Sequence, residues 1–438
     1  MTSKGKFSQS TAMAIVIANM IGTGIFTSLG FQLADITSGF VIMALWVIGG
    51  LMSLCGALCY AELGSRLPRS GGEYNFLSEI YHPGAGFISG WISATVGFAA
   101  PTALAAMTFG TYLSSVFPQS NLSPTWLASI LVLSMTAIHS TTHRNSAGLQ
   151  SFFTVAKILL IIGFSVAALF AVETTQSVDY FPKSSDVSVF TSGAFAVSLI
   201  YVGYAYTGWN AATYLTGEIE NPKRSLPRVL MVGTGVVMIC YIMLNYVFLA
   251  VAPMDAMAGE LEIGYIAATY AFGETGATIM GVSLSLLLVS TVSAMLVAAP
   301  RVLQVLGEDY PVFDKLSKTN KHNIPATAIW LQSAMAMAFL LTSSFETILI
   351  FSGATMAINS LFVVFGVFIM RKRSARENDD EPSFKIPFYP FPPIIFIAIS
   401  TVTLVYLAML NFEEILFCGV LIVTGGIGYY LTQKFSKK

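Results

Sequence analysis

Long runs of apolar residues recur along almost the whole chain, separated by short polar or charged stretches. A helix needs about 20 apolar residues to cross the hydrocarbon core of a bilayer. On that criterion the pattern predicts twelve membrane-spanning helices. They cover residues 11–34, 39–63, 84–116, 125–139, 147–172, 190–216, 226–251, 275–299, 325–341, 346–370, 387–410 and 415–432.

Two of these runs contain residues that disfavour a helix at mid-depth. In the first run the break is Gly22-Thr23-Gly24, and in the sixth it is the segment 203–208, which begins and ends with glycine. Glycine costs about 1 kcal/mol relative to alanine in a helix interior. Irregular backbone at this depth persists only where it is buried in protein or lines a cavity. We therefore predict two interrupted helices that face each other across one small site.

Composition agrees with a membrane protein. The 438 residues are 55% hydrophobic and 10% charged, with a mean hydropathy of +0.72, whereas soluble domains carry about 25% charged residues. With the N-terminus in the cytoplasm and twelve alternating spans, 20 of the 22 Lys and Arg residues fall in or beside cytoplasmic loops. This distribution follows the positive-inside rule. We expect a multi-pass protein of the plasma (inner) membrane with both termini in the cytoplasm.

The two breaks lie five spans apart, so the chain enters the first from the cytoplasm and the sixth from outside. Paired interrupted helices in corresponding halves indicate an inverted repeat with a site near the bilayer midplane. We expect one all-α transmembrane domain over 1–438. It comprises a first five-helix repeat at 11–172, a second, inverted repeat at 190–370, and two appended helices at 387–432.

The backbone at the two breaks offers complementary chemistry. The amides of residues 22–24 form the N-terminus of an outer half-helix, where the helix dipole and unpaired N–H groups suit a carboxylate. Carbonyls around Tyr204, Ala205 and Thr207 are expected to lack helical partners and to suit an ammonium. The pair fits the two charged ends of an α-amino acid. The alternative is that the glycines only permit close helix packing.

Side chains near the second break refine this prediction. Asn210 follows the break and is expected to contact either the substrate or a neighbouring helix. Tyr204 is expected to lie over the substrate as an aromatic gate. Apart from Lys157, the predicted lining offers no fixed charge, which favours a small, neutral substrate side chain.

Lys157 lies about 15 Å into the fifth span, at the rise of an α-helix. A lysine at that depth costs about 2.5–3.5 kcal/mol, so partners must compensate for it. The candidates are carbonyls released by the first break and the hydroxyls of Ser290 and Thr291 in the eighth span. Lys157 would then couple three spans, as a bound sodium ion would. One alternative is a lysine that snorkels to the membrane surface, but Lys157 lies too deep for that. The other alternative is a proton relay.

Polar residues outside the spans predict gates and structural pairs. Ser70, with Glu73 three residues later, is expected to cap a short amphipathic helix before the third span. That helix is either a cytoplasmic gate or a plain interfacial helix. Glu62 and Arg66 are four residues apart and are expected to pair. The segment 252–272 is expected to form a lid on the outer face.

Several motifs resemble the amino acid permeases. Residues 21–26 (IGTGIF) resemble their glycine–polar–glycine motif, and residues 59–64 (CYAELG) and 68–74 (PRSGGEY) resemble their second span and the following loop. Residues 206–210 (YTGWN) and 218–227 (EIENPKRSLP) are similar to the L-amino acid transporter branch of the amino acid–polyamine–organocation superfamily. The resemblance extends over nearly the whole chain.

This resemblance implies the leucine-transporter fold and sodium-independent amino acid exchange. By the same match, the carboxylate is bound at Ile21, Thr23 and Gly24, and the amine at Tyr204, Ala205 and Thr207. Tyr204 stands where the family often has a gating phenylalanine. Lys157 matches a lysine placed beside the vacated sodium site.

Animal members of this branch carry a cysteine between the third and fourth spans for a disulfide to a glycoprotein heavy chain. The segment 117–124 has none, and the four cysteines all fall in apolar runs. We therefore expect a stand-alone, monomeric, bacterial transporter of the alanine–serine–cysteine type. Its expected partners are small neutral L-amino acids and the lipid bilayer, with no heavy chain, nucleic acid, cofactor or metal.

The resulting prediction is sodium-independent transport of small neutral L-amino acids across the plasma membrane by alternating-access exchange. A proton-coupled amino acid symporter that uses Lys157 is the alternative. A channel would need a repeated pore-lining motif, and an enzyme would need clustered His, Asp or Cys at one membrane face. The sequence contains neither. A nutrient sensor built on the same fold also stays open.

Overall fold

The computed structural model describes residues 7–141, 146–321, 324–377 and 384–436. These ranges hold helices and connecting segments but no β-strand, only one isolated bridge between Phe7 and Ile219. The α-helices are α1 (Gln9–Met20), α2 (Gly24–Asp35), α3 (Gly39–Arg66), α4 (Glu73–Ile80), α5 (Pro83–Ile92), α6 (Ala99–Val116), α7 (Pro124–Thr141), α8 (Ser146–Ala171), α9 (Asp186–Phe190), α10 (Gly193–Ala205), α11 (Pro222–Val251), α12 (Met254–Met257), α13 (Ile263–Asp309), α14 (Asp314–Ser317), α15 (Ala326–Thr342), α16 (Phe345–Glu377), α17 (Phe391–Leu410) and α18 (Phe412–Ser436). A π-helix, η1 (Ser93–Gly97), and three 3-10 helices, η2 (Pro118–Ser120), η3 (Ala211–Glu218) and η4 (Pro311–Phe313), complete the set.

The helices are long enough for a membrane protein. In the described ranges, nine helical stretches have the length and apolar composition needed to cross a bilayer, and α10 and α15 are shorter apolar helices. Each of the twelve predicted apolar runs contains a helix. The predicted all-α class is therefore confirmed. The number of crossings and the side on which the termini lie stay predictions, and the terminal residues 1–6 and 437–438 lie outside the described ranges.

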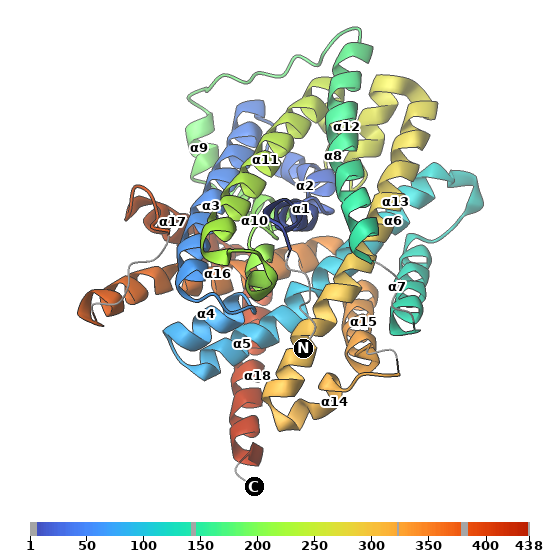
Figure 1. Cartoon of the computed structure of the whole chain (residues 1–438). Helices are drawn as coiled ribbons and strands as arrows, with labels where there is room; N and C mark the ends of the chain where they lie inside the picture. Colours follow the sequence, from blue (N-terminus) through green and yellow to red (C-terminus); the bar gives the residue numbers. More distant parts are fainter. Residues whose placement is uncertain (1–6, 142–145, 322–323, 378–383, 437–438) are drawn as a thin grey trace.

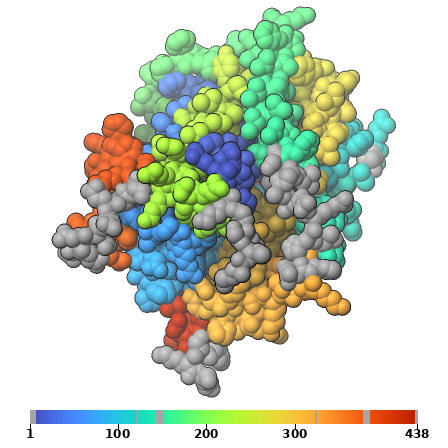
Figure 2. Space-filling view, in the orientation of Figure 1, coloured from blue at the N-terminus to red at the C-terminus, as the bar shows by residue number. Residues whose placement is uncertain are grey.

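The broken first helix lies inside the bundle. In Figure 1, α1 is seen near the centre of the view, with α11 on one side and α8 on the other. It contacts both of these helices and η3, while α2 continues beyond the break and contacts α10. In the space-filling view, the start of this helix (dark blue) reaches the surface between yellow-green residues near 220 and the teal α8 (Figure 2).

Large apolar side chains cover the outer surface of the peripheral helices. Trp126 on α7 is 72% exposed and Phe170 on α8 is 87% exposed. Helices that are apolar on their outward face as well as on their packed face are typical of a membrane environment. The outer surface therefore has the chemistry that lipid chains require.

The first break forms where the glycines predicted it. α1 begins after Ser8, whose side chain accepts a hydrogen bond from the Thr11 amide, and it ends at Met20. Ile21 then leaves the helical conformation, with φ −74° and ψ 81°. α2 starts at Gly24, so three residues separate the two half-helices.

The second break differs in part from its prediction. α10 stays helical through Ala205, so Gly203 and Tyr204 are not part of the break. The irregular turn covers residues 206–210, where Gly208 has φ +101°, a conformation that favours glycine. The chain then continues as the 3-10 helix η3 and not as an α-helical half. The helix ends here because Thr207 turns its amide and hydroxyl back onto the Tyr204 carbonyl.

Three further segments differ from their predicted structure. Ser70 does not cap α4, which starts after Gly72 and has no side-chain cap. Its hydroxyl instead accepts a hydrogen bond from the Gly217 amide at 2.8 Å. The predicted third span contains the π-helix η1, and the eighth is part of the longer α13, which bends at Gly273 (φ +70°).

Candidate functional site

The two interruptions meet backbone to backbone. A Cβ atom on Gly24 would lie 2.6 Å from the Cα of Ala205, and one on Gly208 would lie 2.8 Å from the carbonyl carbon of Asn19. Neither distance leaves room for a side chain. The start of α2 therefore touches the end of α10, and the turn after α10 touches the end of α1. The predicted meeting of the two breaks is present in the structure.

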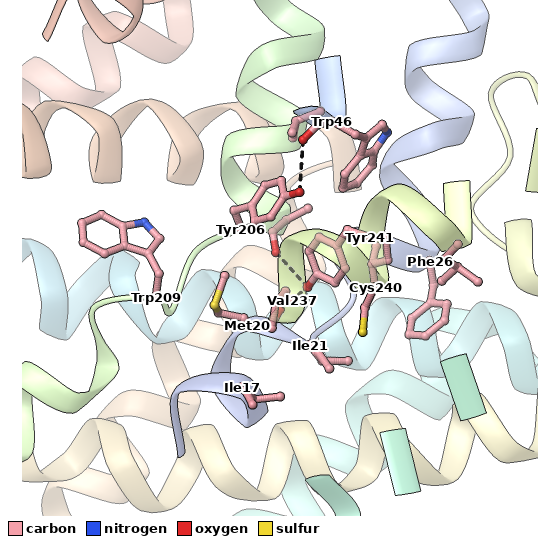
Figure 3. Close-up of a cluster of buried hydrophobic side chains, with 14 of the residues drawn as sticks. Ile17, Met20, Ile21, Phe26, Trp46, Tyr206, Trp209, Val237, Cys240 and Tyr241 are labelled. Atoms are coloured by element: carbon pink, nitrogen blue, oxygen red, sulfur yellow. Dashed lines mark hydrogen bonds between the residues drawn. The ribbon is translucent and has the colours of Figure 1, made fainter. Parts of the chain in front are cut away.

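A tyrosine from α11 joins the two broken segments. The hydroxyl of Tyr241 donates to the Met20 carbonyl at 2.5 Å and lies 3.1 Å from the Ala205 carbonyl. Beside it, the Tyr206 hydroxyl donates to the Trp46 carbonyl of α3 at 3.1 Å. Figure 3 shows these rings gathered around the junction, with the centroids of Tyr206 and Tyr241 5.0 Å apart. The junction is thus fixed by α3 and α11 as well as by its own glycines.

The N-terminus of α2 lies at this junction with two unpaired amides. Neither the Thr23 amide nor the Gly24 amide donates to another described residue. The Gly22 amide, which was expected to be available, instead donates to the Met20 carbonyl at 2.8 Å. Amides at a helix N-terminus form a ready anion-binding arrangement. Two of the three predicted donors are therefore available for a carboxylate.

The carbonyls of the second break are less free than predicted. The Tyr204 oxygen accepts from both the amide and the hydroxyl of Thr207, at 2.9 and 2.7 Å, and the Ala205 oxygen faces the Tyr241 hydroxyl. The expectation that both carbonyls lack partners is therefore wrong. A carbonyl oxygen has two lone pairs, so the Ala205 oxygen retains the capacity to accept one further donor.

Lys157 on α8 reaches the first break, as predicted. Its side chain is buried, and its Nζ donates to the Ile21 carbonyl at 2.8 Å and to Thr291 Oγ1 on α13 at 2.9 Å. Of the two predicted hydroxyl partners, Thr291 forms the bond and Ser290 does not. The ammonium therefore ties α8, α13 and the interrupted first helix at one point.

Two further predicted residues link the second break to other segments. The phenol of Tyr204, in the last turn of α10, interacts with the side chain of Thr23 in the first break. Asn210 donates through Nδ2 to Glu73 Oε1 on α4. Asn210 therefore contacts a neighbouring helix, which is one of the two partners predicted for it.

On the α2 side, several contacts close over the junction. The ring of Phe31 stacks on that of Phe345 with centroids 5.8 Å apart, and its centroid lies 5.7 Å from that of Tyr201. The Gly259 amide donates to the Gly30 carbonyl at 2.8 Å. The segment predicted as a lid therefore docks on α2 at Gly30, six residues after the helix begins.

On the α1 side, charged and polar contacts close the bundle. Glu62 accepts from Arg66, as predicted, and also from Arg371 on α16, at 2.6 and 2.8 Å. Phe7 and Ile219 form the isolated bridge, through which the start of the chain pairs with the residues after η3. The junction is thus enclosed from both directions.

Sequence reasoning missed Tyr241, Arg371 and the role of Glu73. Tyr241 is one aromatic residue in a long apolar run, and nothing near it in sequence marks its contact with two breaks. Arg371 lies in a basic cluster 309 positions after Glu62, so no short-range pattern pairs them. Among the described residues there is no group of three or more His, Cys, Asp or Glu side chains that could hold a metal ion.

Comparison with known proteins identifies the class of protein to which this arrangement belongs. A family model described as "Amino acid permease" matches residues 7–425, nearly the entire chain. The chain therefore belongs to the amino acid permease family, and it is a multi-pass membrane transporter of the L-amino acid transporter type.

Individual relatives are similar over most of their length. The chain is 27% identical over 433 residues to the serine/threonine exchanger SteT of Bacillus subtilis (strain 168), covering 97% of this chain and 96% of SteT. It is 26% identical over 434 residues to the b(0,+)-type amino acid transporter 1 of Mus musculus, covering 96% and 86%. It is 28% identical over 451 residues to the large neutral amino acids transporter small subunit 2 of Homo sapiens, covering 98% and 80%.

The glycines at the junction are expected to be intolerant of alanine. Gly24→Ala and Gly208→Ala each force the touching backbones apart, and overpacking of this kind costs about 1–3 kcal/mol. Both variants should lower the Tm of the purified protein and weaken amino acid binding. Gly235→Ala on α11, where a Cβ would meet nothing within 4 Å, is the matched control and should melt at or above the wild-type Tm, because alanine is favoured over glycine in a helix interior. Equal Tm values for all three variants would contradict the close approach.

The hydrogen bonds of Lys157 predict a graded series of variants. Lys157→Met leaves the Ile21 carbonyl without its charged donor, and hydrogen bonds to charged groups contribute about 1.5–3 kcal/mol. We expect the transport rate to fall much more than the affinity for the amino acid. Thr291→Val should have a smaller effect of the same kind, and Ser290→Ala should have almost none. Labelled amino acid binding and transport measured on the same preparations test the series, and unchanged flux in Lys157→Met would exclude a coupling role.

Proposed function

We propose that this protein exchanges small neutral L-amino acids across the plasma membrane by alternating access, without sodium. The observation that carries the proposal is the contact of Gly24 with Ala205, which brings the amide end of α2 against the carbonyl end of α10. A donor surface and an acceptor surface at one junction match the carboxylate and ammonium groups that all α-amino acids share. Side-chain selectivity then depends on the remaining lining, which favours neutral groups.

The proposed architecture is the twelve-helix leucine-transporter fold with both termini in the cytoplasm. Residues 11–172 and 190–370 would form the two inverted five-helix repeats, and residues 387–432 the two additional helices. The position of the interruptions supports this assignment, since each lies in the first helix of its repeat. The charge pattern of the loops supports the orientation.

The substrate would lie alongside the contact between the two interrupted helices. Its carboxylate is assigned to the backbone of Ile21, Gly22, Thr23 and Gly24, principally to the free amides of Thr23 and Gly24. Its ammonium is assigned to the carbonyls of Ala205 and Thr207, because the Tyr204 carbonyl already accepts two hydrogen bonds from Thr207. The Tyr204 ring would cover the bound molecule. The relatives favour the substrate class, since SteT is named a serine/threonine exchanger and the mammalian relatives are named amino acid transporters.

Lys157 would replace the sodium ion of sodium-driven carriers. A fixed ammonium holds the Ile21 carbonyl and Thr291 together, so no cation has to enter and leave in each cycle. Exchange then follows because the empty carrier lacks the contacts that a bound substrate makes with both breaks. The contacts of Phe31 would close the outer side, and those of Glu62 the cytoplasmic side.

A stand-alone monomer is the proposed form of the protein. The four cysteines are free thiols within the structure, and the segment between α6 and α7 contains none. A mammalian relative is named as a small subunit, but this chain lacks the cysteine that the resemblance associates with a disulfide-linked partner.

Reconstituted exchange tests the proposal. Liposomes loaded with unlabelled L-serine or L-alanine should take up labelled external substrate several-fold faster than empty liposomes, because the loaded carrier returns with substrate. Replacing sodium by potassium should not change the rate. Loading with L-lysine or L-glutamate serves as the control and should stimulate little. Uptake into empty liposomes that is driven fully by an inward proton gradient would contradict exchange and would indicate the alternative, proton-coupled symport.

A further inference from the structure

The loop before α4 is bound tightly to η3. The Gly217 amide donates to the Ser70 hydroxyl at 2.8 Å, and the Gly72 amide donates to the Thr213 carbonyl at 3.3 Å. A Cβ on Gly72 would lie 2.9 Å from the ring of Tyr214. Because η3 follows the second break directly, this loop holds the segment next to that break in place.

Glu73 lies at the centre of this contact. Its side chain is 2% exposed, and Oε1 accepts from the Tyr60 hydroxyl at 3.1 Å and from Asn210 Nδ2. The Tyr214 side chain also faces the carboxyl, while Oε2 has no hydrogen-bond partner of ordinary geometry in the described part of the chain. Glu62, the other buried carboxyl on this side, accepts from two arginines.

Among the side chains that the structure describes, no arginine or lysine bonds to Glu73 from the elements packed around it. From α3 it meets Tyr60, and from η3 it meets Tyr214. Arg66 and Arg371 donate to Glu62. Other neighbouring groups bond to other partners. Arg373 of α16 donates to the Glu79 and Ile80 carbonyls, and Tyr74 of α4 donates to Asp309. α5 carries no ionisable side chain.

We propose that Glu73 is a proton-dependent latch that holds η3 closed when protonated and releases it when ionised. This inference rests on the exchange function proposed above and adds a regulatory element to it. Glu73 acts as a positioning residue, since it reaches the second break through Asn210 and not through the substrate.

The direction of the pH effect follows from burial. Burial raises the pKa of the Glu73 carboxyl, and hydrogen bonds from Tyr214, Tyr60 and Asn210 oppose that rise. When the loop leaves η3, the carboxyl meets water and its pKa returns to the ordinary value of about 4.3. The closed form therefore binds the proton more tightly, so acid favours closure and alkali favours opening. Each unit of difference in pKa changes the open-to-closed ratio about tenfold.

The pH profile of exchange provides the first test. In substrate-loaded liposomes with equal pH on both sides, wild-type exchange should slow down as the pH is lowered through the raised pKa. Glu73→Gln, which mimics the protonated acid, should exchange slowly at every pH. Glu79→Gln makes the same change at an exposed position of the same helix and should keep the wild-type profile. An unchanged profile in Glu73→Gln, with exchange intact, would overturn the latch while leaving the proposed function in place.

The variant Tyr60→Phe tests the latch proposal if Glu73→Gln does not fold. It removes a donor that stabilises the ionised carboxylate, so the closed-state pKa should rise and the midpoint of the exchange profile should move to higher pH. A midpoint that stays in place or moves to lower pH would count against the latch.

Amide hydrogen exchange provides a second test that does not depend on transport. The amide of Gly217, which bonds to Ser70, should be more protected at low pH than at high pH after correction for the intrinsic rate. In Glu73→Gln the protection should be high throughout, and in Glu79→Gln it should follow the wild type. Protection that is independent of pH in the wild type would overturn the latch, whereas a pH-dependent result without amino acid exchange would contradict only the proposed function.

Discussion

The whole helical bundle depends on the close approach of two interrupted helices inside it. Gly24 leaves no room for a side chain against Ala205, and Gly208 leaves none against Asn19. Glycine is unfavourable in a helix interior, so its value here lies in the contact it permits. Tyr241 then bonds to the carbonyls that each helix end exposes. Without this approach, the free amides of α2 would face an ordinary helix and would not face a second polar terminus.

Two kinds of contact surround the junction, and they differ in how easily they can change. On the α2 side the closure is mainly aromatic, through Phe31 and its neighbours. On the α1 side it is charged and hydrogen-bonded, through Glu62 and Glu73. Aromatic contacts respond little to pH, whereas a buried carboxyl without a cationic partner responds strongly. Closure on the α1 side can therefore respond to pH, whereas closure on the α2 side responds little.

The sequence predicts those parts of the site that depend on rare residues at fixed places. A glycine pair inside an apolar run and a lone lysine at mid-depth each have few structural explanations, so the first break and the Lys157–Thr291 contact follow from the sequence. The second break is less well predicted, because Thr207 closes the last turn of α10 with its own hydroxyl. The sequence around Ser70 is typical of a helix cap, yet the Ser70 hydroxyl accepts a hydrogen bond from the distant Gly217 amide. Such a contact, like that of Glu62 with Arg371, joins positions too far apart for a local pattern to predict.

The central claim is that one amino acid is bound at both charged ends where the two breaks meet. Competition against labelled L-serine binding to the purified protein, with analogues that lack one charged end, tests it most directly. Loss of a charged hydrogen-bonded group costs about 1.5–3 kcal/mol, so propionate, ethylamine and L-alanine methyl ester should each compete at least about tenfold more weakly than L-alanine. An analogue with only one charged end that competes as well as L-alanine would contradict the account.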